Sequence, residues 1–355
     1  MDNKDSEFYQ KKLQKQILNF RDVCKELPDY AVKFLQSKEF NSSYSTLKEY
    51  AYDLKTFFTF LQNNNPQLNN LKLIEIPVNT LELLNEDDFL EYQHYLRMNV
   101  LSGKTKTNNN KSIARKITSL RGLYGYLKQK NYISIDIKNL IPVPKYSDRK
   151  TEIKRLHTDA NNNEVNEFIQ GLDGILSSDK LSEHQKSYIA RDLIRDTAIL
   201  HLFLGTGIRV SECEGLDVSD VDFKEKNIRI KRKGGFYDVV YFGANVEEKL
   251  LKYINVYRTP EQVKIYGSAL FLSATNERMG TAALRQIVEK YTLIICGKRL
   301  TPHKLRATYG THLYKETKDI RLVADVLGHT NINTTAKHYA AQLEENKKNA
   351  ANIRY

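Results

Sequence analysis

The chain lacks the features that mark several common classes of protein. It has only 3 cysteines, Cys24, Cys213 and Cys296, which lie far apart and show no Cys-x-x-Cys spacing. This excludes a disulfide framework or a thiolate zinc site and fits a reducing cytoplasm. No segment approaches the run of about 18 apolar residues that a membrane-spanning helix needs. The charged start, residues 1–20, lacks the apolar core of a signal peptide, so we expect a soluble cytoplasmic protein.

Further absences narrow the chemistry. The sequence shows no phosphate-binding glycine loop, internal repeat or heptad array. Four histidines, His303, His312, His329 and His338, gather near the C-terminal end, which makes a zinc site the obvious rival reading. However, no His-Glu-x-x-His spacing is present and no carboxylates interleave with the histidines. We therefore predict neither a metal nor any other cofactor.

The abundant feature is positive charge. Lysine and arginine total 55 against 43 acidic residues, giving a formal charge of +12 and a pI near 9.3. The excess favours an anionic partner such as nucleic acid, although charge alone fits an ordinary basic protein equally well. A length of 355 residues exceeds what one compact domain usually holds, which predicts two domains.

The first part of the chain is predicted to be helical. Across residues 43–62, apolar side chains recur at steps of three and four, which is one face of an amphipathic helix. Ser43 or Ser45 can cap its start, and Pro66 stops it. A further helix is expected at residues 86–99, with acidic residues at its N-terminal end. The apolar positions of the first helix are Leu47, Ala51, Leu54, Phe58 and Leu61.

A basic surface is predicted beside a second apolar stripe. Residues 104–111 are too polar to pack into a core, so we expect a loop that leads into a helix. Lys111 and Arg115 lie one turn apart on the outer side of that helix. The alternative is an ordinary solvated face. The apolar stripe is Ile113, Ile117, Leu120, Tyr124 and Leu127, and the candidate phosphate contacts are Lys104, Lys106, Lys111, Arg115, Lys116 and Arg121.

A break in the helical periodicity of apolar residues, between the two parts of the chain, predicts the domain boundary. Two prolines, followed by charges without periodicity, are typical of an extended linker. We predict an all-α N-terminal domain at 1–148, a linker at 149–160 and a mixed, mainly α domain at 161–355. The second domain should contain a small antiparallel sheet, since residues 227–242 alternate as a hairpin that turns at Gly234-Gly235.

Candidate chemistry lies in the second domain. In "LGTGIRVSECEGL", Gly205 and Gly207 permit a sharp turn after a buried helix, and Arg209 opens the next helix. Such an arginine can hold a phosphate, and Glu212 can orient its guanidinium. Taken alone, the pair fits a surface ion pair at helical spacing better.

Two further clusters point to phosphoryl oxygens. Lys233 stands at the tip of the predicted hairpin, where a lysine is also an ordinary turn residue. In "TPHKLRATYGTHL", Pro302 is a favoured first-turn residue, and His303 and Arg306 then share one helix face. Arginine does not ligate metals, whereas imidazole and guanidinium both donate hydrogen bonds to oxyanions.

In this order, these motifs resemble the tyrosine recombinases, the family of phage integrases and Xer recombinases. The resemblance lies in "TGIRVSE", "RKGG", "HKLRATYGTHL" and "LGHTNINTTAKHY" and spans the whole second domain. The segment "KTKTNNNKSIARKITSLRGLYGYL" is similar to the end of the family's helical, SAM-like core-binding domain. The absence of an obvious extra arm-binding domain favours a Xer-like member.

The resemblance implies a role for each matched residue. Tyr339 would attack the scissile phosphodiester and form a 3′-phosphotyrosyl link, and Lys233 would protonate the leaving 5′-hydroxyl. Arg209 and Arg306 would clamp the non-bridging oxygens. The supporting positions would be His303, which helps accept the tyrosine proton, His329, which hydrogen-bonds the phosphate, and Glu212, the acidic residue after the first arginine. The reaction would need neither metal nor ATP, because the covalent link conserves the bond energy.

Two departures from the family pattern leave questions open. Many relatives have Gly-Lys-Gly at the hairpin, so Lys231, Arg232 or Lys233 could be the acid, and the following Gly-Gly favours Lys233. Tyr339 lies ten residues after His329 rather than nine, and His338 directly precedes it. The family's bacterial members favour cleavage by each protomer's own tyrosine.

The expected function is site-specific recombination of double-stranded DNA, with resolution of chromosome dimers at a dif-like inverted repeat. Homodimers would bind each site and a homotetramer would form the synapse. The tail after residue 344 would dock on a neighbouring protomer, and a DNA translocase or accessory protein could activate cleavage. The close alternative is an integrase or excisionase of a transposon or phage. A type IB topoisomerase, or a DNA-binding descendant that no longer cuts, are the rivals from other classes.

Overall fold

The structure is a computed structural model of the chain. It describes residues 7–101, 104–135, 140–141, 143–144, 156, 163–179, 181–232, 234–329 and 331–332. The chain divides into two compact units, Met1–Arg149 and Lys150–Tyr355. The predicted limits at 148 and 161 stay predictions, because most of the intervening segment lies outside the described residues.

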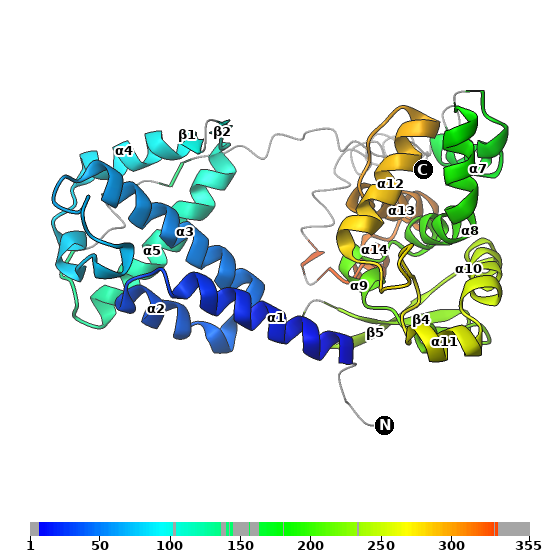
Figure 1. Ribbon diagram of the computed structural model, residues 1–355, viewed down its shortest axis with the longest axis horizontal. Helices are drawn as coiled ribbons and strands as arrows, with labels where there is room; N and C mark the ends of the chain where they lie inside the picture. Colours follow the sequence, from blue (N-terminus) through cyan, green and yellow to red (C-terminus); the bar gives the residue numbers. More distant parts are fainter. Residues whose placement is uncertain are drawn as a thin grey trace, which may run out of the picture. The chain divides into compact units, whose positions relative to one another are not determined.

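Unit 1 is mainly helical (Figure 1). Apolar side chains from all of its α-helices meet in one core, and the five positions predicted for the second apolar stripe are all buried there. The α-helices are α1 (Glu7–Cys24), α2 (Asp29–Gln36), α3 (Tyr44–Asn64), α4 (Glu86–Arg97) and α5 (Asn110–Gln129), with short 3₁₀ turns η1 (Glu39–Asn41), η2 (Leu73–Glu75) and η3 (Val78–Glu82).

The predicted starts of α3 and α4 are confirmed by their caps, whereas α4 ends at Arg97, short of the predicted limit at 99, because Met98 begins β1. Ser43, rather than Ser45, caps α3, and its hydroxyl accepts from the Thr46 amide. The helix ends at Asn64, just before Pro66. Asn85 caps α4 in a reciprocal arrangement with Asp88, which also places negative charge at the helix start.

One expectation for unit 1 was wrong. Residues 104–107 form a strand, β2 (Lys104–Thr107), instead of a loop, and pair antiparallel with β1 (Met98–Leu101). The alternation of lysine with threonine explains the difference, because β-branched threonine favours extended backbone even where polar residues prevent core packing. The hairpin is a small addition to an otherwise helical unit.

Unit 2 combines helices with a three-stranded antiparallel sheet of order β3-β4-β5. The predicted hairpin is confirmed, with Ile228 opposite Val240 and Ile230 opposite Asp238. Its strands are β3 (Val221–Asp222), β4 (Asn227–Lys231) and β5 (Tyr237–Tyr241); its helices are α7 (Glu164–Asp173), α8 (Glu183–Thr206), α9 (Val210–Glu214), α10 (Ala244–Tyr257), α11 (Pro260–Tyr266), α12 (Thr281–Cys296), α13 (Pro302–Thr317) and α14 (Ile320–Val326), with 3₁₀ turns η4 (Ile175–Ser177) and η5 (Val218–Asp220).

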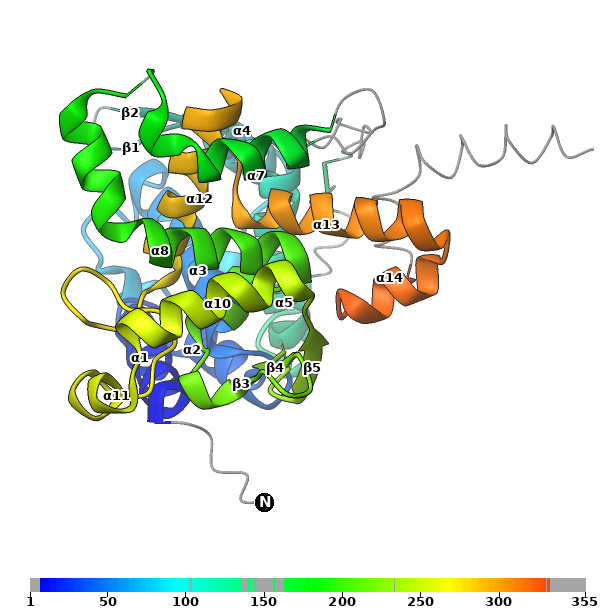
Figure 2. The ribbon, with the colours of Figure 1, turned by 90° about the vertical axis from the view of Figure 1, so that its right-hand side faces the viewer.

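Helix α8 is the centre of unit 2. Residues 198–203 are buried without a break, and α8 packs against α10 on one side and α13 on the other (Figure 2). A helix that is apolar around its whole circumference must lie inside the protein. Its C-terminal end therefore fixes where the following loop, which carries Arg209, emerges. Within the described part of the chain, no helix has both the length and the apolar character needed to cross a membrane.

Candidate active site

The first predicted cluster forms where α8 passes into α9. Gly207 ends α8 with φ of 63°, and a Cβ there would lie 2.5 Å from Cδ1 of Tyr309, so only glycine fits this turn. Arg209 caps α9. Its amide donates to Glu212 Oε2 at 2.7 Å and its Nη1 to Glu212 Oε1 at 2.8 Å. Glu212 is 2% exposed, so the predicted pair is a buried anchor rather than a surface ion pair.

The second predicted cluster lies at the start of α13, which begins at Pro302 as expected. His303 is exposed in the first turn. Arg306 is only 3% exposed, and its Nη1 donates to the Gly207 carbonyl at 2.5 Å. Helical spacing puts both residues on one side of α13, but burial separates them: His303 faces solvent and Arg306 joins the α8–α9 turn.

The third predicted cluster is the end of α14. Gly328 has φ of 58°, its amide donates to the Asp325 carbonyl at 2.7 Å, and the His329 amide donates to the Ala324 carbonyl at 2.8 Å. This pair of hydrogen bonds is the Schellman motif, which closes a helix with a left-handed glycine. The expectation that Gly328 ends a helix just before His329 is confirmed.

Three arginines meet the carbonyls that this motif leaves without helical partners. The last carbonyls of a helix need donors, and cations favour the negative end of the helix dipole. Each carbonyl accepts from Nη2 of a different arginine. The pairs are Arg232 with Val326 at 3.0 Å, Arg306 with Leu327, and Arg209 with Gly328 at 2.9 Å. The structure therefore gathers Arg209, Arg306 and the His329 backbone around one turn.

The hairpin tip adds to this cluster. The Gly235 amide donates to the Arg232 carbonyl at 3.0 Å and the Arg232 amide to the Phe236 carbonyl at 2.9 Å, so the chain reverses between Arg232 and Phe236. Lys233 itself lies outside the described residues. Lys231 extends over the Tyr237 ring, with Nζ 5.7 Å from its centroid. Arg232 is buried, 4% exposed.

The sequence offered Arg232 only as one of three candidates for the acid and not as a buried member of the arginine cluster, but it contains a signal for its burial. Ile228, Ile230 and Arg232 alternate along the chain, and residues two apart in a strand share a face. Because Ile228 and Ile230 are buried, Arg232 must also point inward unless the strand breaks.

Neighbouring thiol and phenol groups are poor nucleophiles. Burial raises the pKa of the Cys213 thiol, next to Glu212, so the reactive thiolate is scarce. Burial likewise raises the pKa of the Tyr309 phenol, which packs on Gly207. The predicted nucleophile Tyr339, its neighbour His338 and the tail after residue 344 lie outside the described residues.

In unit 1, the predicted phosphate contacts separate into different environments. Arg115 grips the buried Asp53 with both Nη atoms, at 2.7 and 2.9 Å, and the Lys116 ammonium lies 3.0 Å from the same carboxylate. Lys111 is exposed on α5. Arg121 is half-buried and donates to the Ile141 carbonyl. The side chains of Lys104 and Lys106 lie outside the described residues, so the surface stays a prediction.

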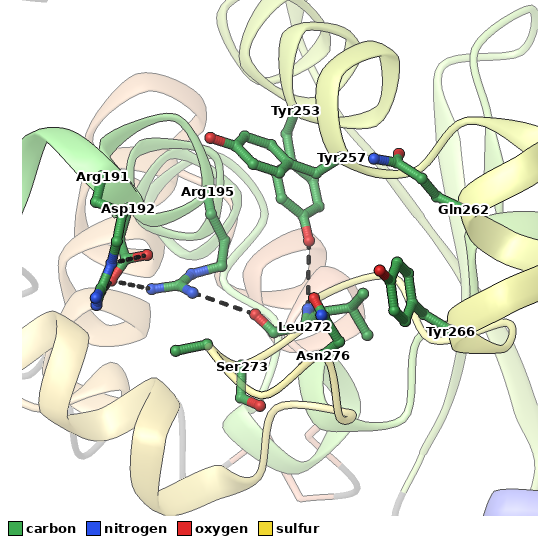
Figure 3. A pocket seen from close by; sticks show the side chains of 11 residues that line it. Arg191, Asp192, Arg195, Tyr253, Tyr257, Gln262, Tyr266, Leu272, Ser273 and Asn276 are labelled. Atoms are coloured by element: carbon green, nitrogen blue, oxygen red, sulfur yellow. Dashed lines mark hydrogen bonds and ion pairs between the residues drawn. The ribbon is translucent and has the colours of Figure 1, made fainter.

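A cavity of about 270 Å³ lies elsewhere in unit 2 (Figure 3). Tyr253, Tyr257 and Tyr266 line it together with Arg195, and the backbone of Leu272 holds its wall through both Tyr253 and Arg195. Among the described residues, none of the three clustered arginines contributes to the lining. The arginine cluster therefore lies apart from this cavity.

Comparisons with known proteins identify the class. Residues 178–346 match the model of the phage integrase family, and residues 33–131 match the N-terminal SAM-like domain of phage integrases. The two matches cover most of the chain. The chain therefore belongs to the phage integrase family and is a Xer-like tyrosine recombinase, an enzyme class that cleaves and rejoins DNA.

Comparisons with individual proteins show how similar the chain is to particular recombinases. The chain is 32% identical to the tyrosine recombinase XerS of Streptococcus mutans over 93% of this chain and 96% of that protein. It is 28% identical to XerC of Thermodesulfovibrio yellowstonii, over 82% and 83% of the two chains. The fold resembles that of XerH bound to a palindromic difH substrate, with a TM-score of 0.58 and 21% identity over 84% of this chain and 77% of that one. It also resembles the Tn1549 transposon integrase with circular intermediate DNA, with a TM-score of 0.57 and 20% identity over 89% of this chain and 94% of that one. The predicted two-domain fold, helical SAM-like and mixed catalytic, is confirmed.

Proposed function

We propose that the chain catalyses site-specific recombination through a covalent phosphotyrosyl intermediate formed by Tyr339. The observation that carries this proposal is the convergence of Arg209 and Arg306 on the turn that ends in His329. Arg209 and Arg306 stand 97 residues apart in sequence, and both donate to backbone carbonyls of this turn, at Gly328 and Leu327. Fixed cations beside an imidazole are what a pentavalent phosphorane requires.

The proposed chemistry is a transesterification. The Tyr339 oxygen attacks the scissile phosphorus, the new O–P bond forms, and the bond from phosphorus to the 5′ oxygen breaks. His303 accepts the phenol proton and Lys233 gives a proton to the leaving oxygen. Arg209 and Arg306 donate to the non-bridging oxygens, His329 adds a third donor, and Glu212 orients Arg209 through two hydrogen bonds.

The proposed substrate is double-stranded DNA with a dif-like inverted repeat. The Xer names of the relatives and the DNA in the XerH and Tn1549 structures support this class of substrate. The formal charge of +12 fits a polyanionic partner. Homodimers on each site and a homotetramer in the synapse follow from the symmetry of an inverted repeat. Resolution of chromosome dimers, activated by a DNA translocase or accessory protein, is the role that we propose.

A nicked suicide substrate tests the chemistry, because the small fragment beyond the nick diffuses away and traps the covalent adduct. Wild-type protein should form the adduct and Tyr339→Phe should form none. Tyr309→Phe is the matched control: it keeps the ring that packs on Gly207 and should form the adduct at the wild-type rate. An adduct with Tyr339→Phe, or none with wild type, would refute the proposal.

The choice of DNA separates the related functions. A dif-like repeat should recombine only when two sites are present. Recombination confined to the ends of a mobile element would instead identify a transposon or phage integrase. Relaxation of supercoiled DNA without any specific site would identify a type IB topoisomerase.

A further inference from the structure

We propose that Arg232 is a positioning residue that aligns the Gly328–His329 turn with the hairpin that carries Lys233. The inference rests on the proposed function, because it concerns how two groups of that reaction reach the same phosphate. Arg232 does not touch the DNA in this proposal. It acts through the turn that it supports.

Strand geometry places Arg232 inside the protein. It follows β4 directly and continues the inward face of Ile228 and Ile230, and it is 4% exposed. Its backbone closes the hairpin through hydrogen bonds with Gly235 and Phe236. The residue thus belongs to the hairpin by its backbone, while its side chain extends away from the hairpin tip towards α9 and α14.

The guanidinium of Arg232 joins three segments of the chain. Nε donates to Asp238 Oδ2 at 2.8 Å, Nη1 lies 3.4 Å from both carboxylate oxygens of Glu212, and Nη2 donates to the Val326 carbonyl at 3.0 Å. These partners lie on β5, α9 and α14 respectively. The planar fork of arginine satisfies acceptors in three directions at once, whereas a lysine ammonium is a single point of charge.

Close packing locks the turn onto the guanidinium. A Cβ built at Gly328 would lie 2.8 Å from both Cζ and Nε of Arg232, so the guanidinium fills the space that a side chain at this position would need. Gly328 immediately precedes His329. Any change in the Arg232 plane therefore shifts the backbone that carries the imidazole.

Glu212 links Arg232 to the phosphate-binding arginine. Its carboxylate accepts from Arg209 at 2.8 Å and lies 3.4 Å from Arg232, and it is 2% exposed. A buried carboxylate between two guanidiniums reduces their mutual repulsion. Glu212 thus helps to fix the Arg232 guanidinium beneath the turn before His329, while it holds Arg209 independently through two hydrogen bonds of its own.

The test measures adduct formation on the nicked substrate in single-turnover reactions with full-length protein. Arg232→Met should slow it about 100-fold, the cost of a misplacement of about 1 Å. In a His329→Ala background the same substitution should cost less than about threefold, because the group that it positions is already absent. Arg229→Met is the matched control: Arg229 is an exposed arginine on β4 that pairs with Asp220, and its loss should change the rate less than about twofold.

A substrate with sulfur at the 5′ bridging position separates positioning from acid catalysis, since a thiolate leaves without protonation. On this substrate the rate of adduct formation by Lys233→Ala should return to near the wild-type rate, whereas that of Arg232→Met should stay slow. Recovery of Arg232→Met, or a full 100-fold loss in the His329→Ala background, would overturn the inference.

Folding and function are controlled separately. Circular dichroism and binding to an unnicked site check that each variant folds. If Arg232→Met does not fold, Arg232→Lys keeps the buried charge and carries the same test. If wild type forms no adduct, the proposed function itself fails; if wild type reacts through Tyr339 and both Arg232 variants match its rate, only this inference fails.

Discussion

Asp53 in unit 1 and Glu212 in unit 2 are both buried carboxylates with arginine partners, and each is 2% exposed. Asp53 lies on α3 and receives its partners from a single helix, α5: Arg115, Lys116 and Ser119 all donate to it. Glu212 shares its two arginines with backbone carbonyls at the end of α14. The first arrangement joins two helices, and the second joins three separate chain segments: α9 with its cap, the end of β4 and the end of α14.

The difference indicates what each cluster does. A carboxylate on one helix that accepts hydrogen bonds from side chains of a neighbouring helix fixes the distance and register of the two helices. Such a contact contributes to stability. A carboxylate that orients arginines toward a turn fixes the positions of the groups that we propose take part in the chemistry. Substitutions in the two units should therefore differ in whether stability or reaction rate changes.

The largest effect is expected in unit 2, on rate. Arg306→Ala should slow adduct formation at least about 100-fold, because it removes a proposed phosphate donor and leaves the Gly207 and Leu327 carbonyls without this partner. Single-turnover cleavage of the nicked substrate measures it. Arg299→Ala, an exposed arginine before α13, should change the rate less than about twofold. Equal loss in both variants would mean that the arginine cluster has no special role.

The next effect is expected in unit 1, on stability. Asp53→Asn should lower the free energy of unfolding of unit 1 by about 2 kcal/mol, since it weakens four charge-assisted hydrogen bonds whose cations keep partial access to water. Amide hydrogen exchange on α3 and α5 reports it. Asp22→Asn, at an exposed carboxylate on α1, is the matched control. Unchanged rates of amide hydrogen exchange in Asp53→Asn would show that the Asp53 cluster does not stabilise the packing of α3 on α5.

Replacement of a glycine by alanine should change the free energy of unfolding in opposite directions in the two units. Gly207→Ala should destabilise unit 2 by about 1–2 kcal/mol, because φ is 63° and the methyl group meets Tyr309. Gly125→Ala, inside α5 with open space around it, should stabilise unit 1 by about 0.5–1 kcal/mol. Thermal unfolding of both variants measures the pair, and the same sign in both would contradict the assignment of the strained turn.

The smallest effect concerns pH. Burial lowers the pKa of His201, on α8, below its ordinary value, so the unfolded chain takes up a proton at a higher pH than the folded chain does. Unit 2 should lose stability as the pH falls below about 6.5. His201→Gln should flatten that dependence, whereas His184→Gln, at an exposed position on the same helix, should not. Chemical denaturation between pH 7.5 and about 5.5 compares them.

Prediction from sequence succeeded where local rules decide the outcome. The Ser43 cap, the stop before Pro66, the start of α13 at Pro302 and the glycine end of α14 all depend on residues within one turn of each other. It failed at β2, where a polar segment formed a strand because a partner strand was available. Such pairing is not a property of the segment alone.

The sequence by itself determined the class of the protein, through the order of its motifs, and the local turns that carry Arg209, His303 and His329. Tertiary structure decided which of the arginines meet. Arg209, Arg232 and Arg306 come from segments up to 97 residues apart, 209 to 306, and they converge because the Schellman end of α14 leaves three carbonyls in need of donors. The sequence around a distant arginine does not show which helix end its side chain will reach. Only the fold therefore reveals that Arg232 lies beneath Gly328.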